Sequence, residues 1–151
     1  MQLTFQPESW SSIAEEIAPY AEQQWREMST DQDLFRIDMD WDRYAAWDAA
    51  GNLLAFTARD SGRLIGWHLS LIGTHPHYKN IIMGMQDTYY LLPEYRSIPT
   101  LGIRIFLEMG QAAKARGARK LIGNTKSYAD KSSVFERLGW RKEGLIFTKV
   151  T

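Results

Sequence analysis

Residues 83–116 constrain the fold of this chain more than any other segment. The largely apolar run 83–92 predicts a buried strand, and residues 101–116 repeat apolar side chains at helical spacing. Backbone N–H groups at the start of a helix lack internal partners, and the helix dipole places partial positive charge there. Arg96, in the turn between the two elements, adds a cation with a planar fork that suits phosphate. We therefore expect this strand–helix junction to hold a phosphate-bearing cofactor.

The segments before residue 83 predict two helices and three strands. In chain order these are a strand at 3–5, a helix at 13–28, a short helix ending at residue 50, and strands at 53–59 and 64–72. Pro19 should kink or split the first helix because proline removes a helical hydrogen bond. Asp40 or Asp42 should begin the second helix, and Gly51 should end it. The turn at Gly62 joins the last two strands into an antiparallel hairpin.

The segments after the central strand and helix predict a strand at 120–124, a helix ending at 138, and a terminal hairpin. We expect Ser127 or Asp130 to cap that helix, and Gly144 to form the turn between strands at 140–143 and 145–150. Residues 73–79 read as a loop. Strands with helices between them, including one strand–helix–strand crossover, predict an α/β (α+β) fold: a mixed, mostly antiparallel central sheet with helices on both faces.

Length and composition narrow the class of protein further. A chain of 151 residues, 44% of them hydrophobic, predicts a single globular domain over residues 1–151. No apolar run approaches the roughly 18 residues that span a membrane, and no signal-peptide pattern opens the chain, so we expect a cytoplasmic protein. The chain has no cysteine, which excludes disulfides, a thiol nucleophile and cysteine-based zinc sites.

Charge is unevenly distributed along the chain. Residues 1–60 carry four Arg/Lys and twelve Asp/Glu, a net charge of −8, whereas residues 101–151 carry eleven and four, a net charge of +7. A basic half suits a phosphorylated cofactor, and an acidic half suits a cationic acceptor such as an amine. Solvated helix faces would give the same pattern. We do not expect nucleic-acid binding, because the chain is neutral overall and has no aromatic–basic motif.

Three motifs resemble those of the GNAT superfamily of acyl-CoA-dependent N-acyltransferases. Pro93-Glu94-Tyr95-Arg96 resembles the strand end that opens the pyrophosphate loop, residues 120–124 the strand that splays away from it, and residues 135–140 the signature that ends the late helix. Order and spacing match over roughly residues 52–150. The sequence of residues 77–96 is similar to sequences of acetyltransferase-like proteins from tailed phages and prophages.

The resemblance implies acetyl-CoA as cosubstrate and assigns residues to it. The pyrophosphate would be held at the start of the helix, by Arg96, Ser97, Leu101, Gly102 and Ile103. The pantetheine arm would follow Leu91 and Leu92, with a backbone N–H of one of them facing the thioester oxygen and Asn124 bonding the arm from the neighbouring strand.

Direct transfer to an amine also needs proton carriers. His77 has the pKa range that suits a base, and Asp87, a carboxylate in an apolar strand, is the other candidate. The family's frequent acid position is occupied by Phe135, so the resemblance leaves Tyr128 as a replacement acid. His75 and His77 flank Pro76, but no third ligand is evident, and we predict no metal site.

Two departures from the family pattern motivate an alternative function. The loop from Arg96 to Gly102 contains one glycine, at its far end, and Pro99 has no N–H to donate. Together with Phe135, this glycine-poor loop is compatible with a non-catalytic phage or prophage interaction protein on the same fold. The sheet edge near the terminal hairpin would also allow pairing into a homodimer.

Overall fold

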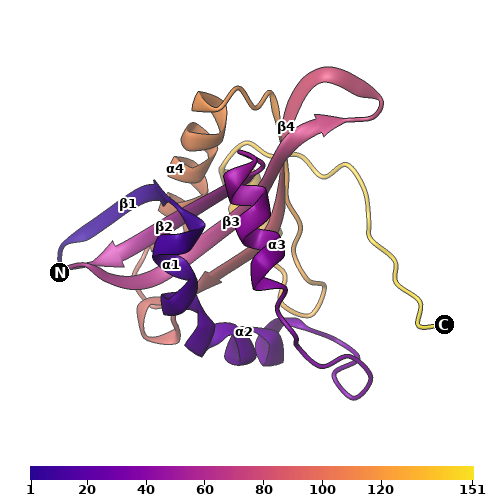
Figure 1. The fold of residues 1–151 in the computed structure, drawn as a ribbon. Helices are drawn as coiled ribbons and strands as arrows, with labels where there is room; N and C mark the ends of the chain where they lie inside the picture. The colour runs from indigo at the N-terminus through magenta and orange to yellow at the C-terminus, as the bar shows by residue number, and fades with distance from the viewer.

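The computed structural model describes residues 1–151 as one sheet with helices on both faces (Figure 1). In chain order the elements are β1 (Leu3–Glu8), α1 (Trp10–Ile17), the 3-10 turn η1 (Ala18–Tyr20), α2 (Ala21–Met28), α3 (Trp41–Ala49), β2 (Leu53–Asp60), β3 (Arg63–His75), β4 (Tyr78–Leu91), the 3-10 turn η2 (Pro93–Tyr95), α4 (Leu101–Ala115), β5 (Lys120–Ile122) and α5 (Ser132–Arg137).

The sheet has the strand order β1-β2-β3-β4-β5. The first four strands pair antiparallel, and β5 pairs parallel with β4. A parallel pair needs a crossover, which here is the α4 helix. This arrangement confirms the expected mixed, mostly antiparallel sheet with one strand–helix–strand crossover.

Two apolar cores lie on opposite faces of the sheet. On one face α4 buries Ile105 and Met109 against alternate residues of β2 and β3 such as Phe56. On the other face α1 buries Ile13 against the intervening strand residues, Trp67 among them. Because successive side chains of a strand point to opposite faces, the nearly continuous apolar run of β2 supplies both cores.

The helical segments follow the expected sequence signals. Pro19 splits the first helix into α1 and α2 with a 3-10 turn between them. Asp40 caps α3, since its carboxylate accepts a hydrogen bond from the N–H of Arg43 at 2.9 Å. Gly117, in the left-handed region at φ 87°, follows α4 and turns the chain toward β5.

Two expectations about connections were wrong. Residues 73–79 are mostly strand, because β3 runs to His75 and β4 begins at Tyr78, which leaves a tight hairpin. The terminal hairpin is absent, since residues 138–151 form neither helix nor strand. Neither run of that segment pairs with the sheet, so its β-propensity alone does not order it. None of the helices combines the length and apolarity that a membrane crossing needs.

Candidate active site

The second half of β4 has an open edge. β5 pairs with β4 only from Met83 to Met85, so residues 86–91 have no partner strand on that side. The N–H of Leu92 donates to Ile65 of β3 at 2.9 Å. Since backbone groups alternate along a strand, the N–H of Leu91 points to the open edge. Of the two leucines, Leu91 therefore has the backbone donor directed away from the sheet, and the N–H of Leu92 is already bonded.

A β-bulge lies in the middle of this open stretch. Leu69 pairs with Thr88 and Ser70 with Gln86, so Asp87 is an extra residue in β4. The side chain of Asp87 contacts Tyr44 of α3, and that of Thr88 contacts Gln24 of α2. The bulge thus turns two successive polar side chains of β4 toward the N-terminal helices.

Asp87 is held by a tyrosine rather than by a cation. The Tyr44 hydroxyl donates to the carboxylate at 2.6 Å, while Asp87 stays exposed. Tyr44 is itself fixed by stacking on Trp10, with ring centroids 4.7 Å apart, and by an edge contact with Trp47. Burial and the adjacent carboxylate raise the pKa of Tyr44, so its proton stays in this hydrogen bond. Asp87 therefore presents a side chain that the Tyr44 hydroxyl orients at the open edge.

The first turn of α4 offers unpaired donors. The N–H of Leu101 reaches Ile98 at 3.4 Å, and that of Arg104 reaches Thr100 at 2.8 Å. The N–H groups of Gly102 and Ile103 donate to no protein acceptor. Both belong to a helix of 15 residues, so the dipole adds partial positive charge at these donors.

Gly102 is also a point of close approach. A Cβ at this position would lie 2.8 Å from the hydroxyl oxygen of Tyr89, which extends from β4 to the start of α4. Burial raises the pKa of Tyr89 to about 12, and its hydroxyl therefore remains protonated. The glycine lets a polar hydroxyl and two free N–H groups meet where β4 and α4 converge. This group of donors suits an anion, and the sequence analysis assigned no role to the Tyr89 side chain.

Arg96 reaches across the open edge of β4 instead of toward α4. Its Nε donates to the carbonyl of Leu91 at 2.8 Å, and its Nη2 contacts Glu27 of α2 at 2.7 Å. Its guanidinium also lies over the Tyr90 ring, 5.1 Å from the centroid. The cation expected to hold phosphate is thus paired with a carboxylate of the N-terminal helices.

The remaining predicted site residues lie in the loop before α4, at the start of α4, and just after β5. Ser97 is exposed and Leu101 is buried beneath the start of α4. The carbonyl of Asn124 accepts a hydrogen bond from Gln86 at 3.3 Å, which ties the end of β5 to β4 where they diverge. The Tyr128 hydroxyl donates to the carbonyl of Met28, at the end of α2. Tyr128 thereby spans from the β5 side of the open edge to the N-terminal helices.

His77 does not lie with these residues. It sits in the hairpin between β3 and β4, where its N–H donates to His75 Nδ1 at 3.1 Å. Ten residues separate His77 from Asp87, which is roughly 30 Å along an extended strand. The structure thus places His77 in the hairpin, away from this edge, where Asp87 is the candidate base; the role of His77 stays a prediction.

A buried polar group lies behind the point where β4 and β5 diverge. His68 is 1% exposed, its Nδ1 lies 3.2 Å from the Ser70 hydroxyl, and its Nε2 has no partner. Gln86 Oε1, in the same layer, is also unpaired. Burial lowers the pKa of His68 to about 3, so the ring is neutral at physiological pH. No group of three or more potential ligands is arranged to hold a metal ion.

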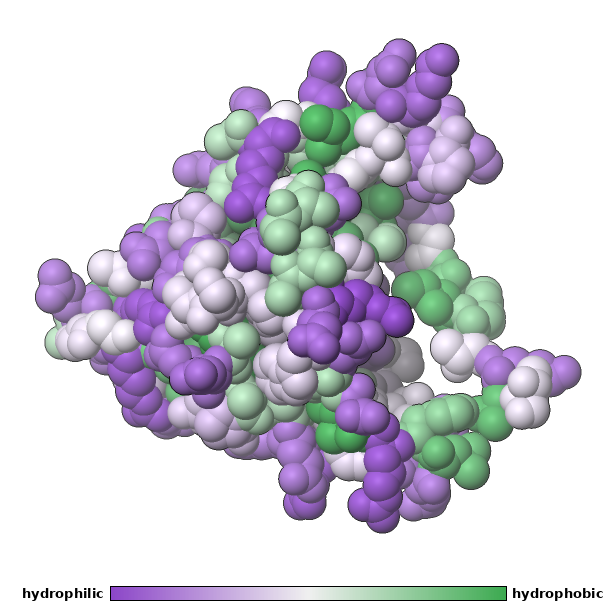
Figure 2. Space-filling view, viewed as in Figure 1, coloured by the Kyte–Doolittle hydropathy of each residue, from purple (hydrophilic) through white to green (hydrophobic).

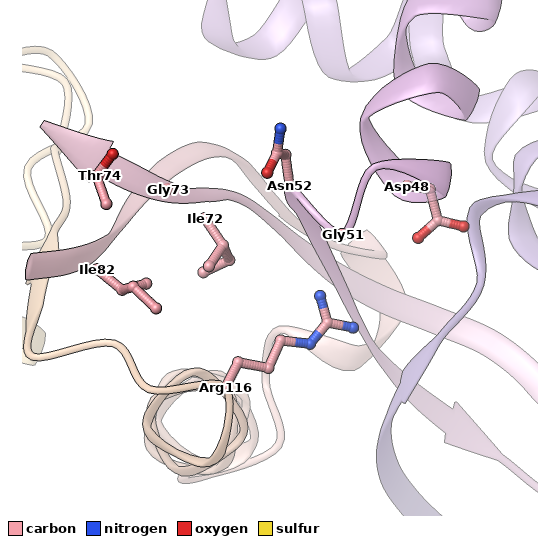
Figure 3. A pocket seen from close by; sticks show the side chains of 8 residues that line it. All are labelled: Asp48, Gly51, Asn52, Ile72, Gly73, Thr74, Ile82 and Arg116. Atoms are coloured by element: carbon pink, nitrogen blue, oxygen red, sulfur yellow. The ribbon is translucent and has the colours of Figure 1, made fainter. Parts of the chain in front are cut away.

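A cavity lies elsewhere in the molecule. About 590 Å³ lies between the start of β2, the end of β3 and the end of α4, where Arg116 points inward (Figure 3). Arg116 donates from Nη1 to the carbonyl of Leu53 at 2.5 Å. This cavity adjoins the C-terminal end of α4, about 20 Å from Gly102 along a helix that rises 1.5 Å per residue. It is separate from the open edge of β4.

Solved structures share this fold. A predicted acetyltransferase from Clostridium acetobutylicum, solved with acetyl-CoA, is 15% identical with a TM-score of 0.75, covering 99% of this chain and 96% of that one. An aminoglycoside acetyltransferase from an uncultured soil sample is 14% identical with a TM-score of 0.74, covering 100% and 99%. A GCN5-related N-acetyltransferase from Ralstonia eutropha is 16% identical with a TM-score of 0.74, covering 99% of each. Neither a protein-family model nor a curated protein matches the sequence.

Because these sequence identities are low, the comparison establishes the fold alone. The chain has the mixed α/β architecture of GNAT acetyltransferases over its whole length. The open edge of β4 and the free donors of α4 are features of this chain's own geometry.

Proposed function

We propose that the protein is an N-acetyltransferase that moves an acetyl group from acetyl-CoA directly to an amine. The observation that carries this proposal is the open edge of β4 leading to the unpaired N–H groups of Gly102 and Ile103. An extended amide-containing arm would pair with such an edge, and a pyrophosphate would accept from such a helix start. The acetyltransferases that share the fold, one of them solved with acetyl-CoA, support the assignment.

The residues of this chain fit acetyl-CoA at three places. Gly102 and Ile103 would donate to the pyrophosphate, with Ser97 and Leu101 in the adjoining turn. Leu91 would donate its outward N–H to the arm or to the thioester oxygen, and Leu92 and Asn124 would border the arm. Arg96 would join the phosphates after leaving Glu27, to which it is bonded here.

Acetyl-CoA would supply an activated acetyl group whose carbon–sulfur bond breaks as the bond to the acceptor nitrogen forms. Asp87 would accept the proton that the amine loses, because its carboxylate is oriented by Tyr44 and exposed at the open edge. Tyr128, with its hydroxyl at the same edge, would return a proton to the thiolate.

The acceptor is proposed to be a cationic amine. The helices over the Asp87 side of β4 belong to residues 1–60, a segment that also includes β1 and β2 and carries a net charge of −8. An aminoglycoside acetyltransferase of the same fold has been solved with sisomicin, at 10% identity and a TM-score of 0.73. That likeness supports a small polyamine-like acceptor as the first class to screen.

The alternative is a non-catalytic interaction protein of a phage or prophage. It is favoured by the loop itself: Pro99 has no N–H, the N–H of Leu101 is directed to Ile98, and Arg96 is bonded to Glu27.

Calorimetric titration with acetyl-CoA and with coenzyme A separates the two functions. Micromolar affinity supports the acetyltransferase and justifies screening amines by release of free thiol. An absence of binding up to about 1 mM, a free energy weaker than roughly −4 kcal/mol, rejects it in favour of the interaction protein.

A further inference from the structure

The cavity at the end of the sheet, which Arg116 enters, has the features of a separate binding site. It has a volume of about 590 Å³, within the range of roughly 300–1,000 Å³ that is typical of small-molecule sites. Figure 3 shows Arg116 extending from the end of α4 into this space, with Ile72 on one side of its side chain and Asp48 on the other. The proposed acetyl transfer uses none of these residues.

Arg116 brings a cation into the cavity with most of its donors free. Its Nη1 donates to the carbonyl of Leu53 at 2.5 Å, which fixes the guanidinium beside the start of β2. Arg116 forms no ion pair with any carboxylate of the chain. A guanidinium carries five N–H donors in a planar fork, so the others suit a carboxylate bound through two hydrogen bonds.

Asp48 brings the opposite charge. Its Oδ2 accepts a hydrogen bond from the Trp10 N–H at 2.9 Å, which holds the carboxylate near the end of α3. Asp48 lines the same cavity as Arg116, yet neither residue forms an ion pair with the other or with a third residue. Two opposite charges that line one cavity without pairing are each free to bind the complementary charge of a single ligand.

The remaining wall of the cavity is apolar. Ile72 is 6% exposed and belongs to the core beneath α4, and Ile82 packs against that core. The backbone N–H of Ile72 donates to the carbonyl of Asn52 at 2.8 Å, so this wall is fixed beside the start of β2. In the view of Figure 2, hydrophilic and hydrophobic groups lie side by side between α3 and the end of α4 and do not merge into one apolar patch. The surroundings therefore suit a small ligand that is itself part charged and part apolar.

We propose that this cavity binds an apolar α-amino acid as a zwitterion. Its carboxylate would bind Arg116, its ammonium group would bind Asp48, and its side chain would lie against Ile72 and Ile82. One cation, one anion and one apolar wall match the three parts of such a ligand. A phosphate or a polyamine would bring a second charge of one sign and leave the opposite charge of the cavity without a partner.

Calorimetric titration of the full chain with L-leucine is the first test. We expect a dissociation constant on the order of 0.1–1 mM, since a ligand of this size makes few contacts. Two analogues each lack one charge: 4-methylpentanoate has no ammonium group, and 3-methylbutylamine has no carboxylate. Each should bind about tenfold more weakly or worse, because it leaves one charged side chain of the cavity without its partner.

Two substitutions locate the ligand. Arg116→Gln should weaken leucine binding by about tenfold or more and leave the affinity for 3-methylbutylamine unchanged, since that analogue has no carboxylate. Asp48→Asn keeps an acceptor for the Trp10 N–H, and it should weaken leucine binding while sparing 4-methylpentanoate. Lys114→Gln is the matched control, because it removes a cation from the last turn of α4 that does not line this cavity. It should leave all three affinities unchanged.

The titrations need no acetyl-CoA, so their outcome does not depend on whether the protein transfers acetyl groups. A dissociation constant for leucine weaker than about 10 mM overturns the proposal, and so does equal affinity for leucine and its two analogues. These two results come from the unsubstituted chain and hold even where a variant does not fold. Full affinity for leucine in a folded Arg116→Gln variant, together with a loss in Asp87→Asn, would place leucine at the open edge of β4 and also overturn it.

Discussion

Arg96 and Glu27 form an ion pair at 2.7 Å that spans the open edge of β4. The Tyr90 hydroxyl donates to the other oxygen of Glu27 at 2.9 Å, and Arg96 Nε caps the Leu91 carbonyl. Burial alone would raise the pKa of Glu27, but the hydrogen bonds from Arg96 and Tyr90 outweigh it and hold that pKa below its usual range. The ion pair therefore closes the edge that the proposed cofactor would occupy, and it links the loop before α4 to α2.

Breaking this ion pair from its two ends should have opposite effects on coenzyme A affinity. Glu27→Gln releases Arg96 for the phosphates, and we expect tighter binding by several-fold. Arg96→Ala removes the cation itself and should weaken binding by about 1–3 kcal/mol, the scale of a charge-assisted hydrogen bond. Calorimetric titration of both variants measures the two changes.

Glu22→Gln is the matched control, since Glu22 pairs with Arg26 at 2.5 Å on the exposed side of the same helix. It should leave affinity for coenzyme A unchanged. Equal weakening by Glu27→Gln and Arg96→Ala would mean that the pair acts as one structural unit and that Arg96 does not exchange partners.

Replacing Asp87 should remove the proton acceptor while preserving the cofactor site. We expect Asp87→Asn to lower kcat for an acceptor found by screening by about 100-fold or more, the usual contribution of a general base. Tyr44→Phe should lower kcat less, because it frees the carboxylate without removing it. Steady-state rates with unchanged affinity for coenzyme A would support the assignment, and a fully active Asp87→Asn would reject it.

The sequence predicted the sheet, the crossover and the start of α4 because these depend on local periodicity and on glycine and proline positions. It did not predict the partners at the site. Tyr44 meets Asp87 across 43 residues, and Glu27 meets Arg96 across 69. Such pairs arise only once the bulge at Asp87 and the packing of α2 are in place. Local sequence patterns predict neither the bulge at Asp87 nor the packing of α2.

The same reasoning explains why the sequence did not give the position of His77 or the structure of the last residues. His77 was assigned as a base from its side-chain chemistry, but its position depends on where the β3–β4 hairpin turns. Residues 140–150 have the composition of a hairpin, yet strand formation needs a partner that can bury its apolar faces. Neither condition can be read from the residues themselves.

The close approach of Tyr89 to Gly102 predicts a coupled pair of substitutions. Gly102→Ala should lose most of the gain of about 1 kcal/mol that alanine gives in a helix, because the new Cβ would lie 2.8 Å from the Tyr89 hydroxyl. In a Tyr89→Phe background the nearest ring atom is 4.0 Å away, and the same change should stabilise the protein. Urea denaturation of the four variants gives the coupling energy, which we expect to be about 1 kcal/mol or more. If the effects of the two substitutions were additive, the Tyr89 hydroxyl would not lie against Gly102 in solution.

Arg59 should govern how the protein responds to acid. Its guanidinium contacts Glu8 at 2.7 Å and Glu16 at 2.7 Å, and both Arg59 and Glu8 are only 13% exposed. Burial opposes the charge on Glu8, but hydrogen bonds from Arg59 and Thr57 prevail and lower its pKa below 4.5. A lowered pKa in the folded state stabilises the protein above about pH 4.5, and that stabilisation is lost as the pH falls through the folded value.

Arg59→Gln should therefore reduce the free energy of unfolding at pH 7 by roughly 2–4 kcal/mol, since it leaves a half-buried carboxylate without its cation. The loss should shrink as the pH falls through the lowered folded-state pKa of Glu8, because a protonated carboxyl no longer needs the cation. Arg104→Gln is the control, because Arg104 pairs with Glu108 on the exposed face of α4 and should cost less than about 1 kcal/mol. Urea midpoints at pH 7 and pH 3 measure the loss of stability in both variants. If the loss caused by Arg59→Gln does not change with pH, the packing of Arg59, rather than its charge, stabilises the β1–β2 edge.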